Sequence, residues 1–174
     1  GGHPMTGSEK TGILSATNTL LENAYYIITP TALTPKEEIS EFRDFVLSLG
    51  AIPLILDYKI HDYSTAAISH LPHMIAYSLV NLVHQIDDDK ETMKTIAAGG
   101  FKDITRIASS SPVMWQNICA SNREPLLSLM DQYLALLTKL RGYIDSSNEQ
   151  ALLSFFQQAK DYRDSITLPS VKSP

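Results

Sequence analysis

The chain changes character near residue 57, and this change limits the folds that it can adopt. Before residue 57, runs of β-branched and aromatic residues alternate with a helical pattern of apolar positions. Beyond it, the apolar positions follow helical spacing and the strand patterns stop. We therefore expect two parts: residues 1–57 as a small βαβ unit and residues 58–174 as an all-helical domain, which makes the fold mainly α.

Two predicted strands frame the first part. Residues 24–29 are aromatic and β-branched, which is typical of a short buried strand. Residues 52–56 form the second predicted strand, and Pro53 favours an edge position. A unit this small cannot form a full sheet, so we expect it to be the last part of a larger α/β domain whose beginning lies outside this chain.

A helix is predicted between these strands. Thr34 is the expected N-cap, with Pro35 at the first helical position and Glu37 completing a capping box. Apolar residues follow at helical spacing, and Gly50 is expected to end the helix.

The second part begins with a long apolar pattern over residues 62–86. Pro72 lies inside it and is expected to kink the helix, because proline removes a backbone donor. The three aspartates at 87–89 end this helix or cap a short one over residues 90–97. Ser111 and the proline after it start another helix.

The clearest predicted helix covers residues 125–144. Its apolar residues alternate spacings of four and three, which is a heptad-like pattern, and further leucines widen the apolar surface. We expect this helix to be buried on most sides. Residues 147–150 form a second predicted capping box that starts a final helix to about residue 166, and residues 168–174 are expected to be loose.

Composition excludes several classes of protein. The chain has 174 residues, 44% of them hydrophobic, and a net charge of -5. Basic residues are scattered among acids, so we expect no nucleic-acid partner. Uninterrupted apolar runs are much shorter than the roughly 18 residues that span a bilayer, so we expect no membrane association. The single Cys119 excludes an intrachain disulfide and fits a reducing compartment, which favours a cytoplasmic location.

Three histidines are candidate site residues. His3 can accept a proton near neutral pH, although a histidine so close to the start can equally be a mobile residue. His70 and His73 project from similar faces of one predicted helix, as half of a metal site or as hydrogen-bonded core residues. A metal needs a third ligand, and His84 lies about 16 Å from His73 along the helix, so we expect no metal.

A second candidate group surrounds Arg106, whose planar guanidinium suits a carboxylate. Asp103 lies one turn earlier, where it orients Arg106 or forms an ordinary surface ion pair with it. Gly99 and Gly100 allow the backbone to approach a ligand closely at a helix start.

Three segments carry a resemblance: His-Pro-Met-Thr-Gly-Ser-Glu at 3–9, Ser-His-Leu-Pro-His at 69–73, and Gly-Gly-Phe-Lys-Asp-Ile-Thr-Arg-Ile-Ala at 99–108. Together they make the chain resemble prephenate dehydrogenase, a family of tyrosine biosynthesis. The resemblance covers the chain to about residue 145, and Thr6 replaces the more usual alanine. It implies that residues 1–57 belong to the nucleotide-binding domain and residues 58–174 to the substrate-binding and dimerisation domain.

The resemblance also assigns roles. It implies that His3 hydrogen-bonds and deprotonates the ring hydroxyl of the substrate. Arg106 would hold a carboxylate, and His73 would contact the substrate directly. The further substrate-site residues that it implies are Gly99, Ser110, His70 as support for the helix, Glu9 as partner of the arginine, and Asp103 and Trp115, which reach the site across a dimer. Packing in the core or the interface is an equal alternative for Trp115.

The implied activity is NAD- or NADP-linked oxidative decarboxylation of prephenate to 4-hydroxyphenylpyruvate; arogenate is an equally compatible substrate. No Gly-x-Gly-x-x-Gly follows a strand, so we expect no tightly bound cofactor and no turnover by this chain alone. We also expect a homodimer with an apolar interface formed by the later helices. The alternative function is a non-catalytic helical dimer that binds a small molecule or a partner protein.

Overall fold

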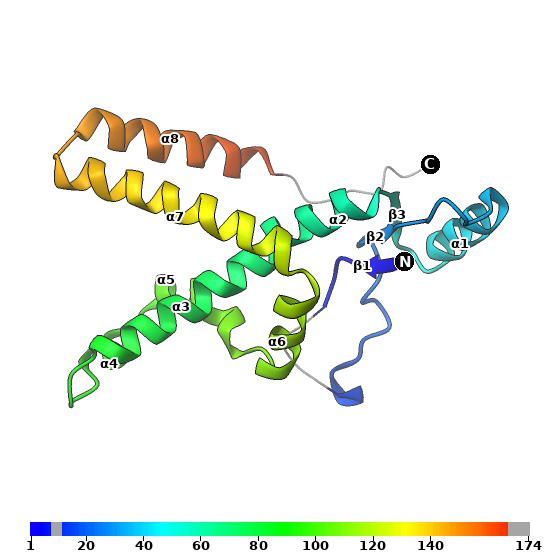
Figure 1. Ribbon diagram of the computed structural model, residues 1–174. Coiled ribbons are helices and arrows are strands. Elements are labelled where there is room, and N and C mark those ends of the chain that lie inside the picture. The colour runs from blue at the N-terminus through cyan, green and yellow to red at the C-terminus, as the bar shows by residue number, and fades with distance from the viewer. Residues whose placement is uncertain (8–11, 167–174) are drawn as a thin grey trace.

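The computed structural model of the protein describes residues 1–7 and 12–166. A small sheet with one helix lies at one end, and a group of helices extends away from it (Figure 1). Most described residues are helical, and the described strands lie before residue 57. The expected fold class, a mainly α chain that begins with a small βαβ unit, is confirmed.

The sheet contains β1 (Gly2–Pro4), β2 (Tyr25–Ile28) and β3 (Ile52–Ile55) in the order β1-β2-β3. Strands β2 and β3 are parallel and are joined by α1 (Lys36–Ser48), so the predicted βαβ unit is confirmed. Within the described sheet β3 is an edge strand, as Pro53 indicated. Strand β1 pairs antiparallel with β2 and was not expected, because the segment around His3 resembles a loop in sequence.

The start of α1 differs from the prediction, while its end agrees. The N-cap is Pro35, and the predicted capping by Thr34 is wrong. The Thr34 hydroxyl instead accepts a hydrogen bond from the backbone N–H of Thr31, 3.0 Å away, so it is engaged in the preceding turn. Gly50 follows the helix with a φ of +76°, a left-handed conformation that glycine adopts without strain.

One continuous helical stretch begins the second region. It consists of α2 (Tyr58–Thr65), a π-helical turn η2 (Ala66–His70) and α3 (Leu71–Ile86). The N–H of Leu71 donates to the carbonyl of Ala66, five residues back, and Pro72 follows in the first turn of α3. The wider turn therefore accommodates the proline that was expected to disturb this helix.

The remaining elements are α4 (Thr92–Ile96), α5 (Gly99–Thr105), the 3₁₀ turn η3 (Arg106–Ser109), α6 (Pro112–Ser121), α7 (Arg123–Asp145) and α8 (Glu149–Ser165); a further 3₁₀ turn, η1 (Ile13–Ser15), precedes β2. The predicted cap before α6 is confirmed. Asp87 ends α3, as one of the two predicted alternatives had it, and the N-cap position of α4 is Glu91, although aspartate carboxylates bond to the start of α4. The carboxylate of Asp87 accepts hydrogen bonds from the backbone of Met93 and Lys94, and the Ser111 hydroxyl accepts one from Met114.

Helices α7 and α8 form a hairpin, and the beginning of α7 meets the long α2–α3 stretch (Figure 1). The N-cap of α8 is Asn148, whose side chain accepts from the N–H of Ala151 at 3.0 Å, so the predicted capping box from Ser147 is wrong. Ser147 has a φ of +50° and belongs to the turn between the helices. Residues 168–174, expected to be loose, lie outside the described residues.

The predicted burial of α7 is wrong for a single chain. Leu126 is its one fully buried apolar residue in the described structure, whereas Leu134 is 57% exposed and Ile144 is 61% exposed. The stretch Tyr58–Ile86 is likewise long and apolar enough to cross a membrane by length and composition, and 17% of its apolar window is buried. A buried helix of a soluble assembly meets the same criterion. Both helices thus carry more apolar surface than one chain covers.

Candidate functional site

A cavity of about 420 Å³ lies where the beginning of the chain meets the helical region. His3 enters it from β1, His73 from α3 and Arg106 from η3. Its remaining lining residues come from the segment after β1 and from η2, η3 and α6: Pro4, Met5, Thr6, Gly7, Ser69, Ile107, Ser110, Met114 and Trp115. Residues separated by a hundred positions in the sequence therefore share one pocket.

The sheet fixes the position of His3. Strand β1 pairs His3 with Ile27, a residue of the small core, so the histidine is held by backbone pairing although it lies near the start of the chain. The N–H of Met5 donates to the carbonyl of Tyr25 at 2.8 Å, which continues this pairing past the histidine. The interpretation of His3 as a mobile residue does not fit this arrangement.

His3 also contacts a histidine that the sequence did not indicate. Its Nδ1 lies 2.8 Å from Nε2 of His61 on α2, and the two rings meet edge to face with centroids 5.1 Å apart. Nδ1 of His61 lies 2.8 Å from a carboxylate oxygen of Asp62. No local signal in the sequence links His61 to a residue 58 positions away.

The helical histidines surround Trp115. The ring of His73 stacks on the indole with centroids 3.7 Å apart, and its Nδ1 donates to the backbone carbonyl of Ser69 at 2.8 Å. His70 is buried and meets the same indole edge to face. Its Nδ1 lies 3.3 Å from the amide nitrogen of Asn122. His73 therefore lines the cavity, and His70 lies behind it as support.

Burial and neighbouring positive charges lower the pKa of each of these imidazoles, which favours the neutral form. Burial, together with the nearby His61, lowers the pKa of His3 below its ordinary value. Burial also lowers the pKa of His73; the hydrogen bond to Ser69 acts in the opposite direction, and the Arg106 guanidinium lowers it further. The pKa of His70 is lowered by burial and by the three other histidines around it, while Asp62 raises it.

Arg106 brings positive charge to the cavity that His3 and His73 also line. It lies at the start of η3, and its side chain lines the cavity. Ser110 at the end of this turn is buried; its hydroxyl donates to the carbonyl of Ile107 at 2.8 Å, and its own carbonyl accepts from Tyr77 at 2.9 Å. Burial raises the pKa of the Tyr77 hydroxyl, which therefore stays a donor. These bonds tie η3 to α3 and fix the backbone that carries Arg106.

Some predicted residues lie elsewhere. Gly99 and Asp103 are on α5 and are not among the residues that line the cavity. Glu9 lies outside the described residues. Trp115 reaches the cavity within its own chain and is almost completely buried, which fits the packing interpretation; a contact across a dimer stays a prediction. Across residues 1–7 and 12–166, no group of three or more potential ligands is arranged to hold a metal ion.

The cavity combines a proton acceptor, a cation and an aromatic floor. A neutral imidazole accepts a proton from a hydroxyl, and a guanidinium holds a carboxylate in a bidentate arrangement. The site therefore suits a small anion that carries a hydroxyl group at some distance from its carboxylate.

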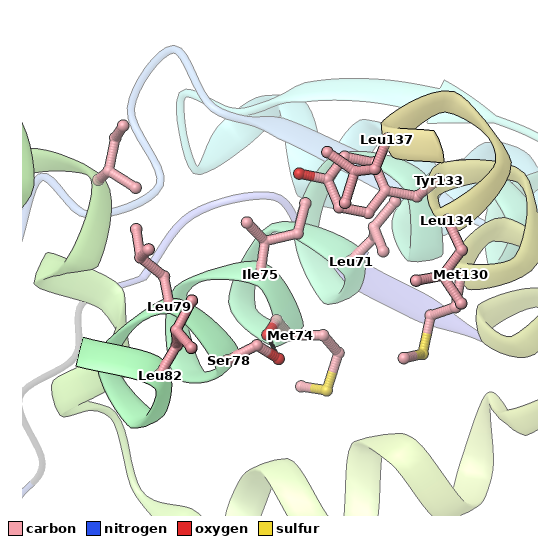
Figure 2. Close-up of a pocket in the computed structure, with 11 residues that line it drawn as sticks. Leu71, Met74, Ile75, Ser78, Leu79, Leu82, Met130, Tyr133, Leu134 and Leu137 are labelled. Carbon is pink, nitrogen blue, oxygen red and sulfur yellow. Dashed lines mark hydrogen bonds between the residues drawn. The ribbon is translucent and has the colours of Figure 1, made fainter. Parts of the chain in front are cut away.

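A second cavity of about 450 Å³ lies between α3 and α7 and is almost entirely apolar. Figure 2 shows Leu71, Ile75, Leu79 and Leu82 on one side of it, with Met130, Tyr133, Leu134 and Leu137 on the other. It offers no charged side chain to a small polar ligand. Its chemistry suits apolar side chains from another helix.

These features define a class of protein: an α/β unit that carries a histidine into a pocket lined by a helical domain. The model of the nucleotide-binding domain of prephenate dehydrogenase matches residues 1–54, and that of the dimerization domain of prephenate dehydrogenase matches residues 57–158, more than half of the chain. The chain belongs to the prephenate dehydrogenase family.

Individual relatives agree. The prephenate dehydrogenase of Bacillus subtilis is 40% identical over 168 residues, which are 97% of this chain and 45% of that protein. The crystal structure of prephenate dehydrogenase from A. aeolicus, in complex with hydroxyphenyl propionate and NAD+, has a TM-score of 0.90 at 31% identity and covers 95% of this chain and 58% of that one. The Synechocystis arogenate dehydrogenase structure has a TM-score of 0.83 at 30% identity, covering 94% and 59%. The chain thus spans about half the length of the curated relative.

The family implies a nicotinamide dinucleotide, whose pyrophosphate is held by a glycine-rich loop between a strand and a helix. Two described helices follow strands of the sheet. The connection to α1, residues 29–35, contains no glycine, and the carboxylate of Asp57 already accepts from the first backbone N–H groups of α2. Neither of these two helix starts fits a pyrophosphate.

Proposed function

We propose that this chain forms the substrate-binding and proton-accepting side of a prephenate dehydrogenase, in the cytoplasm. The whole reaction is NAD(P)-linked oxidative decarboxylation of prephenate to 4-hydroxyphenylpyruvate. The observation that carries the proposal is the meeting of His3, His73 and Arg106 around one cavity. Within it we propose that residues 1–57 and 58–174 act as the nucleotide-binding and the substrate-binding and dimerisation parts.

The proposed chemistry follows from the groups that line the cavity. The hydroxyl on C4 of the substrate ring loses its proton to Nε2 of His3 as C4 is oxidised to a ketone. When bound, the oxidised nicotinamide dinucleotide would supply the acceptor for the hydride that leaves C4. Arg106 holds a carboxylate of the substrate by charge-assisted hydrogen bonds. Loss of carbon dioxide then breaks the bond between C1 and its carboxylate. The electron pair of that bond remains in the ring and gives a phenolate, which takes back the proton from His3 to become the phenol. His73 and Trp115 flank the ring of the substrate and exclude water.

Calorimetric titration of the chain with prephenate, arogenate and 4-hydroxyphenylpyruvate tests the proposal. Arg106→Ala removes a charge-assisted bond of about 1.5–3 kcal/mol, of which the solvent-exposed position of Arg106 screens part, so we expect an affinity loss of about tenfold. Arg43→Ala is the matched control, because Arg43 lies on α1 and pairs with its neighbour Asp44. Binding that is absent in the unmodified chain, or equal in both variants, contradicts the proposal and favours a non-catalytic helical dimer.

We also propose a homodimer in which a second copy covers the apolar cavity between α3 and α7. The support is the exposed apolar surface of these helices, including Leu134 and Leu137, and the match of residues 57–158 to a dimerization domain. Sedimentation at micromolar concentration should show a dimer that Leu134→Glu dissociates. Leu33→Glu, at a residue 92% exposed before α1, should leave it intact. A monomeric unmodified chain contradicts the dimer.

A further inference from the structure

Three side chains form a hydrogen-bonded chain behind the cavity, and the proposed function uses only the first. Nδ1 of His3 lies 2.8 Å from Nε2 of His61, and Nδ1 of His61 lies 2.8 Å from Oδ1 of Asp62. His3 and His61 are partly buried, and the Asp62 side chain is 44% exposed. These three hydrogen-bonded side chains thus run from the cavity toward solvent.

The carboxylate at the end determines the direction of every hydrogen bond. An ionised Asp62 accepts and cannot donate, so Nδ1 of His61 carries a proton. Nε2 of a neutral His61 then has a lone pair, and Nδ1–H of His3 donates to it. Nε2 of His3 is left with a lone pair. In water, neutral histidine prefers the opposite tautomer, with the proton on Nε2.

We propose that Asp62 and His61 are positioning residues that hold His3 as its Nδ1–H tautomer and so keep Nε2 ready to accept the proton of the substrate hydroxyl. This inference rests on the proposed function, in which His3 is the proton acceptor. It assigns a role to two residues of α2 that face the site from behind.

The same three hydrogen-bonded side chains can also move the accepted proton away from His3. As the hydroxyl O–H bond breaks, an N–H bond forms at Nε2 of His3; the N–H bond at its Nδ1 then breaks, and an N–H bond forms at Nε2 of His61. The positive charge finishes on His61, next to Asp62. Burial lowers the pKa of His3, which disfavours keeping the charge there.

Nitrogen-15 spectra of the histidine rings test the inference directly, because protonated and unprotonated ring nitrogens resonate far apart. For the unliganded chain at pH 8 we expect His3 to show a protonated Nδ1 and an unprotonated Nε2. Asp62→Asn places an amide donor beside Nδ1 of His61, which reverses both hydrogen bonds and moves the proton of His3 to Nε2. Asp44→Asn is the charge-matched control on α1 and should leave the spectrum unchanged.

A His3 that carries its proton on Nε2 in the unmodified chain overturns the inference, as does a tautomer that Asp62→Asn leaves unchanged. The spectrum of the unmodified chain shows which nitrogen of His3 carries the proton, so it tests the inference even if a variant does not fold. Because it is recorded without ligand, it is independent of the titrations that test the proposed function. In the holoenzyme Asp62→Asn should lower kcat with little change in KM, and an equal loss from Asp44→Asn would contradict a specific role.

Discussion

Trp115 offers the most direct test of how the cavity is built. It is 6% exposed, stacks on His73 and meets His70 edge to face. Replacing a buried tryptophan by alanine costs about 3–5 kcal/mol, and each aromatic pair adds about 0.5–1.5 kcal/mol. Since the free energy of unfolding of small domains is roughly 5–15 kcal/mol, Trp115→Ala should remove a large part of it.

Trp115→Phe provides the matched comparison. The indole Nε1 is buried without a hydrogen-bond partner among the described residues, and such a donor costs about 1–3 kcal/mol. Phenylalanine keeps an aromatic face for His73 and removes this donor, so we expect a loss of about 1 kcal/mol or less. Urea denaturation followed by far-ultraviolet circular dichroism at one protein concentration measures both. An alanine variant within 1 kcal/mol of the unmodified chain would refute the buried position of this ring.

Three further perturbations test separate parts of the account. The fluorescence of Trp115, the single tryptophan, should be quenched on acidification with a midpoint below 6.5, because burial lowers the pKa of His73; a midpoint at or above 6.5 contradicts this. Since the folded state binds this proton more weakly than the unfolded state, His73 supports stability fully above pH 6.5 and less as the pH falls, which denaturation at pH 7.5 and 5.5 measures. Val46→Ala, at the fully buried centre of the sheet core, should cost about 2 kcal/mol by urea denaturation, and an unchanged midpoint would place Val46 outside the core. Gly50→Ala should lower the free energy of unfolding by about 1 kcal/mol or more in the same assay, because the φ of Gly50 is +76° and Glu22 lies 3.3 Å from the added carbon. An unchanged free energy of unfolding would contradict the left-handed turn.

Local sequence signals predicted most of the fold. The βαβ unit depends on apolar runs, a glycine at the end of α1 and a proline at the edge strand, all of which act over a few residues. Capping was predicted correctly at Ser111, where the proline that follows marks the first helical position. It failed where two neighbouring side chains competed: Asn148 caps α8 in place of Ser147, and Thr34 bonds to Thr31.

The site was predicted less completely, for a physical reason. The three predicted residues could be found because each lies in a short segment that by itself resembles the family: His3, His73 and Arg106. The partnership of His3 with His61 depends on β1 pairing with β2 and on the packing of α2 behind it, which no spacing in the sequence expresses. The exposure of α7 could not be predicted either, because a heptad pattern does not state whether the covering surface belongs to the same chain.

A crystal structure of the protein with bound 4-hydroxyphenylpyruvate tests the central claim most directly. Our account predicts the phenol oxygen within hydrogen-bond distance of Nε2 of His3, and a carboxylate of the ligand on the Arg106 guanidinium. Ligand density in the apolar cavity between α3 and α7, or a ligand in the described pocket that touches neither His3 nor Arg106, would contradict it.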